Sequence, residues 1–152
     1  MTDRLICVFM TKAYRALQTA ELVLASGDAD AAVNRAFNAR ENAILAASLR
    51  AGVPESDLPG THTGLNTVLW ESLVKPGKFD REVARLLSRV ETLRIGADYR
   101  GEEIQPSTAK DALADAKTFV GIVEKRFGLD RVPKHELAAK VQRREKDRDF
   151  ER

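Results

Sequence analysis

Small and apolar residues recur with a helical period over most of this chain, and this repeat constrains the fold more than any other feature. The cleanest stripe follows Pro106 and consists of Ala109, Ala112, Leu113, Ala116, Phe119, Val120, Val123 and Phe127. Such spacing gives a helix one apolar face. Since no segment alternates apolar and polar residues with period two over a useful length, the chain is predicted to be all-α.

Four other segments share this period, and residues typical of turns separate them. The predicted helices run from Thr11 to about Ala25, from Asp30 to about Arg50, roughly from Gly64 to Val74, from an Asp80 N-cap onward, and from a Ser107 cap to Phe127. The second helix has two apolar faces, so neighbours must cover both of its sides. Because one helix is short, we predict a four-helix up-and-down bundle with one additional short helix.

Length and charge divide the chain into two parts. The 152 residues suffice for one core and are too few for two ordinary domains. We place the bundle at residues 10–128 and a charged helical or disordered tail at 129–152. The segment from Lys134 to Arg152 contains seven Lys and Arg and five Asp and Glu, and this excess of two equals the net charge of +2. We interpret the tail as solvated, with an accessory contact to RNA or a partner as the alternative.

The N-terminal residues do not have the pattern of a signal peptide or of a membrane span. Leu5–Met10 is apolar but too short for a membrane span, and it lacks the cleavage pattern of a signal peptide. We interpret it as helix or as a dimer-contact surface. The single cysteine, Cys7, cannot form an internal disulfide, which fits a reducing compartment. We therefore expect a cytoplasmic protein without membrane contact.

Arg94 breaks the pattern of the helix that follows Asp80. At about 100° per residue from Val83, Leu87 lies at about 40° and Arg94 at about 20°, inside the apolar stripe. Burying an arginine without a partner costs several kcal/mol, whereas pairing with Asp98 at i+4 returns only about 0.2–0.5 kcal/mol. Either the helix end projects into a wet cleft, or an anionic group from another helix, a second subunit or a ligand phosphate meets the guanidinium.

A ladder of asparagines marks the predicted second helix. Asn34, Asn38 and Asn42 recur every fourth residue, with Arg35 beside them. Asparagines are mildly unfavourable inside a helix, so three in register suggest hydrogen-bonding work near the same cleft. The alternative is a polar seam satisfied by neighbouring helices or water.

Five segments follow one another in a recognisable order: DAAVNRAFNARENAILAASL, THTGLNTVL, LVKPGKF, LSRVETLRIGADY and AKDALADAKTFVGIVEKRF. In this order the chain resembles the HEPN domain family, and above all the small stand-alone prokaryotic members often encoded beside a minimal nucleotidyltransferase. The similarity spans about Lys12 to Phe127. It implies a homodimer in which the ends of the fourth helices approach each other, a nucleotidyltransferase partner, and no cofactor or metal.

The resemblance also implies a site. Many family members are metal-independent ribonucleases, acting as toxins or antiviral factors, whose Arg is followed after four to six residues by a His. Arg94 matches the arginine, but Ile95–Gly101 contain no histidine. His62, in the loop THTG, is a candidate substitute, and Asn38 departs from the aromatic pair that the family tends to place there.

Two functions are therefore open. The first is a HEPN interaction protein of a toxin-antitoxin or defence-type module, which binds a nucleotidyltransferase and RNA or nucleotide through a cleft without cutting. The second is an RNA-cleaving toxin, with Arg94 on the phosphate and Asp98 or Tyr99 in proton transfer. A third idea makes Tyr99 the acceptor of a nucleotide from the partner. The cleft residues are Arg94, Asp98 and Tyr99, and the expected contacts to RNA or nucleotide are Arg35, Asn38, Asn42 and Arg100.

Overall fold

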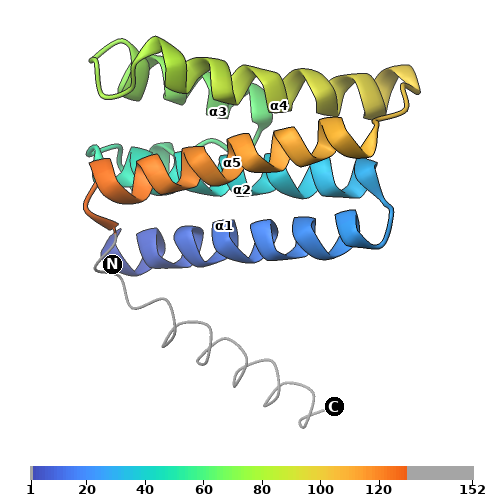
Figure 1. Ribbon diagram of the computed structural model, residues 1–152. Helices are drawn as coiled ribbons and strands as arrows, with labels where there is room; N and C mark the ends of the chain where they lie inside the picture. Colours follow the sequence, from blue (N-terminus) through green and yellow to red (C-terminus); the bar gives the residue numbers. More distant parts are fainter. Residues whose placement is uncertain (1, 130–152) are drawn as a thin grey trace, which may run out of the picture.

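The computed structural model describes residues 2–129 as a set of helices (Figure 1). They are α1 (Thr2–Ala25), α2 (Ala29–Arg50), α3 (His62–Val68), α4 (Arg81–Arg100) and α5 (Pro106–Arg126). A 3₁₀ turn at Glu55–Asp57 precedes α3, and a π-helical segment at Leu69–Val74 continues it. Since the described residues contain no strand, the predicted all-α fold with four long helices and a short one is confirmed. The predicted character of residues 130–152 lies outside the described residues, and the domain boundaries stay a prediction.

The four long helices run alongside one another, with α2 and α5 at the centre (Figure 1). Each of these two packs against the other three long helices, while α1 and α4 form opposite sides of the bundle. The α3 segment packs on α2. A side chain on α2 can therefore meet groups from every other helix.

The core is built largely from alanines on α2, as the two apolar faces of this helix predict. Its buried residues include Val33, Phe37, Ile44 and Leu49, together with Ala32, Ala36, Ala39, Ala43, Ala46 and Ala47. Alanine side chains let helix backbones approach closely, and α1 lies against α2 along much of its length. Leu129, just beyond the predicted boundary at 128, is buried in the same core.

Two helix starts differ from the predictions. The first helix begins at Thr2 rather than Thr11, because Leu5–Met10 continues it and places Ile6 and Met10 in the core. This favours the helix interpretation of that run. The last helix is not capped by Ser107, because Gln105 occupies the N-cap position and Pro106 starts the helix. Proline suits that first position, since its fixed φ is helical and its missing N–H would have no partner there.

The predicted start of α4 is confirmed. The Asp80 side chain accepts a hydrogen bond from the backbone N–H of Val83 at 3.0 Å. At the other end, Gly101 has φ 63°, a left-handed conformation that glycine adopts without a steric penalty. The N–H of Glu102 then donates to the Gly96 carbonyl at 3.2 Å. Both ends of the helix that carries Arg94 are thus fixed locally.

Candidate functional site

Arg94 lies near the carboxyl end of α4 on the side that faces α2. Its side chain is half-buried, and its guanidinium carbon lies 4.4 Å from the centre of the Phe37 ring. A guanidinium within about 6 Å of an aromatic ring gains from a cation–π contact. Arg94 therefore occupies the inner face, as its position on the helix predicts, and an aromatic ring of α2 lies against it.

A second arginine, Arg40 on α2, is more deeply buried than Arg94. It is 2% exposed, and its guanidinium carbon lies 4.9 Å from the centre of the same Phe37 ring. Burying a charge of this kind costs several kcal/mol unless oppositely charged and hydrogen-bonding groups surround it. Arg40 therefore requires such partners.

Three side chains from three helices form a closed polar cluster around that charge. Arg40 Nη2 donates to Asn66 Oδ1 on α3 at 3.1 Å, and it lies 3.6 Å from Glu91 Oε2 on α4. Asn66 Nδ2 donates to Glu91 Oε1 at 2.9 Å. Asn66 thus uses its amide oxygen and its amide nitrogen at once. We call Arg40, Asn66 and Glu91 the polar cluster.

Burial lowers the pKa of Arg40, and the carboxylates of Glu91 and Glu41 oppose that shift. The nearby charge of Arg94 lowers the pKa further. The arginine guanidinium nonetheless stays protonated in proteins at neutral pH. The site therefore holds two permanent cations close together, with carboxylates beside them.

The other predicted cleft residues follow Arg94 in the last turns of α4. The backbone of Asp98, Tyr99 and Arg100 is helical, which puts Asp98 about one turn beyond Arg94. The side chains of these three residues lie outside the described part of the structure. Their part in a cleft with Arg94 stays a prediction.

The asparagine ladder hydrogen-bonds within its own helix. Asn38 Nδ2 donates to Asn34 Oδ1 at 3.5 Å, and Asn42 Nδ2 donates to the Asn38 carbonyl at 2.8 Å. These bonds favour a polar seam, with α2 itself supplying the partners. Arg35 is exposed and lies about 160° around the helix from Phe37. A role for Arg35, Asn38 and Asn42 in binding remains a prediction.

His62 is the first residue of α3, and its side chain lies outside the described ones. Thr61 caps that helix by accepting a hydrogen bond from the Gly64 N–H at 3.1 Å. Among the described residues no three His, Cys, Asp or Glu side chains gather as a metal site would require. No helix within residues 2–129 combines the length and hydropathy of a bilayer span.

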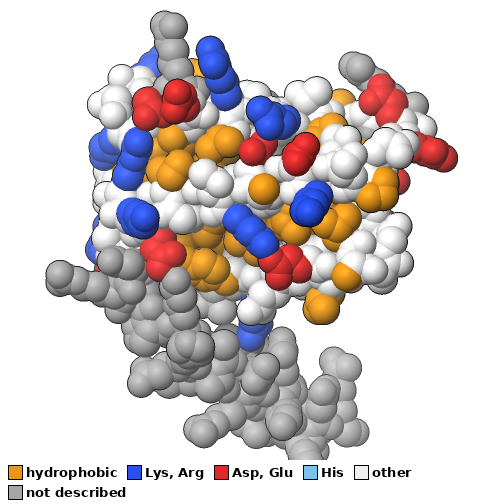
Figure 2. Space-filling view, viewed as in Figure 1, with side chains coloured by type: hydrophobic (Ala, Val, Ile, Leu, Met, Phe, Trp, Pro, Cys, Tyr) orange, Lys and Arg blue, Asp and Glu red, His pale blue; other side chains and the backbone are white. Residues whose placement is uncertain are grey.

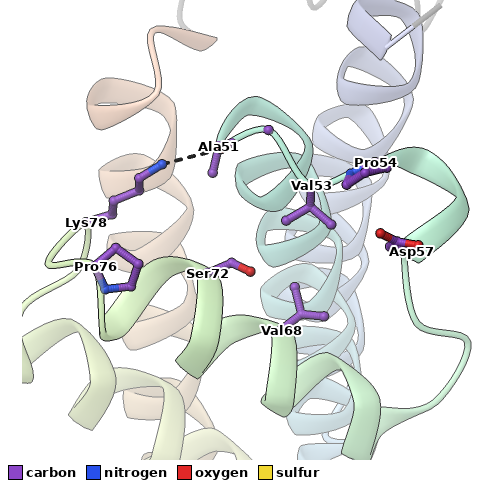
Figure 3. A pocket seen from close by; sticks show the side chains of 9 residues that line it. Ala51, Val53, Pro54, Asp57, Val68, Ser72, Pro76 and Lys78 are labelled. Atoms are coloured by element: carbon purple, nitrogen blue, oxygen red, sulfur yellow. Dashed lines mark hydrogen bonds between the residues drawn. The ribbon is translucent and has the colours of Figure 1, made fainter.

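A surface cavity of about 520 Å³ lies between the loop that follows α2 and the segment of α3 and its π-helical continuation (Figure 3). Val53 and Val68 form part of its lining, and Lys78 Nζ donates to the Ala51 carbonyl at 3.5 Å across one edge. None of the predicted site residues lines it. Among the described residues Arg40 is the buried charged one, and it belongs to the polar cluster and not to the lining of this cavity.

The model of the HEPN domain family matches residues 8–126. The chain belongs to the HEPN domain family. The match includes α2, α3 and α4, and hence Arg94 and the whole polar cluster of this HEPN domain. The chain matches no curated protein.

The sequence also contains a signal for Arg40. Counting from Val33 at about 100° per residue, Phe37 lies at about 40°, Ile44 at about 20° and Arg40 at about 340°. Arg40 thus lies inside an apolar stripe of its helix, as Arg94 does. Asn66 offered no such signal, because its bond to Arg40 joins residues 26 positions apart.

Proposed function

We propose that this chain is a HEPN interaction protein of a toxin-antitoxin or defence-type module. It acts as a homodimer, binds a nucleotidyltransferase partner, and binds RNA or nucleotide phosphate through Arg94 without cutting. The observation that carries this proposal is the Arg94 guanidinium, half-buried 4.4 Å from the Phe37 ring centre in a HEPN domain. A guanidinium fixed in this way offers paired donors to a phosphate group.

The surface charges support recognition at one point rather than over a broad area. Basic and acidic side chains are interspersed on the face seen in Figure 2, with apolar side chains between them. Several exposed cations are paired, among them Arg89 with Asp115 at 3.0 Å and Arg126 with Asp80 at 3.3 Å. Binding of RNA is therefore expected to depend on Arg94 more than on other basic residues of the bundle.

The residues after Arg94 support binding without cleavage. Ile95–Gly101 contain no histidine, the side chain whose pKa near 6.5 best suits proton transfer at neutral pH. Asp98 is an ionised weak base and Tyr99 a weak acid at their ordinary pKa values. Phosphate binding by Arg94 needs neither of them.

Ile95 supports the homodimer. It is 39% exposed beside Arg94, so a large apolar side chain faces outward near the end of α4. A second copy packed there would remove this side chain from water. The charge change Ile95→Glu would then shift the protein toward monomer, which sedimentation velocity would detect.

One observation favours a second function, an RNA-cleaving toxin with a modified site. Arg40 places a second permanent cation close to Arg94, and a positive site can stabilise charge that develops on a scissile phosphate. Asp98 or Tyr99 would then carry the proton. Glu91 and Glu41 offset part of this positive potential, so binding remains the first proposal.

The test compares binding and cleavage in one set of samples. Purified protein is mixed with bulk RNA in EDTA, and with a short fluorescein-labelled single-stranded RNA for anisotropy. Arg94→Ala is measured beside Arg85→Ala, which removes the same charge from an exposed position of α4. We expect only Arg94→Ala to weaken binding by tenfold or more, and the bulk RNA to stay intact.

Two other outcomes would contradict the binding proposal. Cleavage that persists in EDTA and disappears in Arg94→Ala would replace the binding proposal with the toxin. Equal losses in the two variants would mean that no specific site exists at Arg94. The partner is tested by inspecting the neighbouring genes for a nucleotidyltransferase frame. If one is present, its product is co-expressed with this chain and purified through a tag on one of the two.

A further inference from the structure

Asn66 occupies an unusual place, because it ties the α3 segment to the two helices that surround Arg94. Its side chain accepts from Arg40 on α2 at 3.1 Å and donates to Glu91 on α4 at 2.9 Å. Only a primary amide offers an acceptor and a donor at this spacing. Alanine, aspartate or leucine at this position would each lose at least one of the two bonds.

The bond to Glu91 affects where that carboxylate points. Glu91 precedes Arg94 by three residues on α4, a spacing at which opposite charges on a helix commonly pair. In the structure its Oε1 instead meets Asn66, and its Oε2 lies 3.6 Å from Arg40. The cluster thereby directs the Glu91 charge to the buried arginine.

The bond to Arg40 affects the ring on which Arg94 lies. Arg40 and Arg94 share Phe37, at 4.9 and 4.4 Å from the ring centre. Movement of Arg40 would change the space and the electrostatic field on that ring. Asn66 therefore acts on Arg94 along two routes, through Glu91 and through Arg40 with Phe37.

We propose that Asn66 is a positioning residue, which holds Glu91 and Arg40 so that Arg94 keeps its place against Phe37 and binds a phosphate group. The binding of a phosphate group by Arg94 rests on the proposed function. The positioning itself does not depend on any ligand.

The first measurement therefore needs no ligand. A proton held against an aromatic ring shifts in the NMR spectrum, so the Nε–H resonance of Arg94 reports its position relative to Phe37. Arg94→Lys identifies that resonance by removing it. We expect Asn66→Ala to move the Arg94 resonance, and Asn66→Asp to move it also, because aspartate cannot donate to Glu91.

The second measurement is anisotropy with the same labelled RNA. We expect Asn66→Ala to weaken binding by roughly three- to tenfold, a range typical of residues that act through others. Thr67→Ala is the matched control, since it removes a side-chain hydrogen bond that stays within α3, from the Thr67 hydroxyl to the Thr63 carbonyl. It should change neither the Arg94 resonance nor the affinity.

The two measurements test the positioning by Asn66 separately from the phosphate binding by Arg94. An Arg94 resonance that is unchanged in Asn66→Asp, or in a folded Asn66→Ala with a lowered Tm, would overturn the inference and leave Asn66 a purely structural residue. If instead the resonance moves but Arg94→Ala binds RNA like the wild type, positioning stands and the phosphate-binding function fails.

Discussion

Two faces of α2 are both buried, but one makes apolar contacts and the other makes polar contacts. One carries a stripe of buried alanines, including Ala32, Ala36, Ala39 and Ala43, and suits close packing of helix backbones. The other carries Phe37 and Arg40, and it meets polar side chains from α3 and α4. Both are almost inaccessible to water. The alanine face needs only a steric fit, whereas the polar face needs specific partners at specific distances.

This difference bears on the proposed function. Replacing a buried ion pair by apolar residues of similar volume is often neutral or stabilising, so a buried pair is weak support for a stabilising role. The polar face also lies beside Arg94, within the region that matches the HEPN domain family. We therefore attribute its charges to the site rather than to the stability of the bundle.

The largest expected loss of stability comes from a substitution that removes a charge partner of the polar face. Glu91→Ala leaves Arg40 without its close carboxylate, and we expect the free energy of unfolding to fall by about 3 kcal/mol. This is the lower end of the usual range, because Glu91 is 30% exposed and water can reach the site. Urea denaturation measures the change. Glu103→Ala, in an exposed loop, should stay within about 0.5 kcal/mol, and a similar loss in both variants would contradict the prediction.

In the alanine face, by contrast, we expect a larger side chain to destabilise the protein through steric overlap. Ala43 is 0% exposed, so Ala43→Leu inserts a side chain where there is no room, and we expect a loss of about 1–3 kcal/mol. Ala114→Leu, at an exposed position of α5, is the matched control and should be nearly neutral. Equal Tm values for Ala43→Leu and the wild type would mean that the alanine face is loosely packed.

Two asparagines sharpen the comparison further. Asn66→Ala removes two side-chain hydrogen bonds of the polar cluster, and we expect a loss of about 1–2 kcal/mol. Asn42→Ala removes a bond within α2 but adds a better helix former, so its effect should lie within about 0.5 kcal/mol of zero. Thermal unfolding of both variants checks the order, and the reverse order would assign the greater role to the ladder.

The smallest effect concerns the start of α4, where a charge is exposed rather than buried. Hydrogen bonds from the Val83 N–H and the Arg126 guanidinium hold the pKa of Asp80 below its ordinary value of 3.8. The unfolded chain then binds the proton first as the pH falls. The stabilisation from Asp80 is thus complete above the ordinary pKa and is lost as the pH falls through the lower folded value.

Asp80→Asn tests this dependence, since asparagine also caps helices but does not titrate. We expect the Tm of the wild type to exceed that of the variant at neutral pH. The difference should shrink as the pH falls below 4. A difference that stays constant with pH would exclude the ionised carboxylate as its source.

The sequence predicted the elements well and the site partly. Periodicity located all five helices, because each buries one or two faces, and the Asp80 cap followed from its residue type. The Ser107 cap was wrong, because proline at the preceding position already starts that helix. Arg94 was found since one residue departs from an apolar stripe. Arg40 departs in the same way but lies in a helix with two apolar faces, where the departure is less visible.

By itself the sequence determined that the chain forms helices and that Arg94 faces inward. It also determined where the helices begin and end to within a few residues, except at the start of α1. These features depend on contacts between residues close together in the chain. Only the tertiary structure decided that Phe37, Arg40, Asn66 and Glu91 meet near Arg94. They come from three helices, and a hydrogen bond depends on distances and angles in space that no spacing along the sequence specifies.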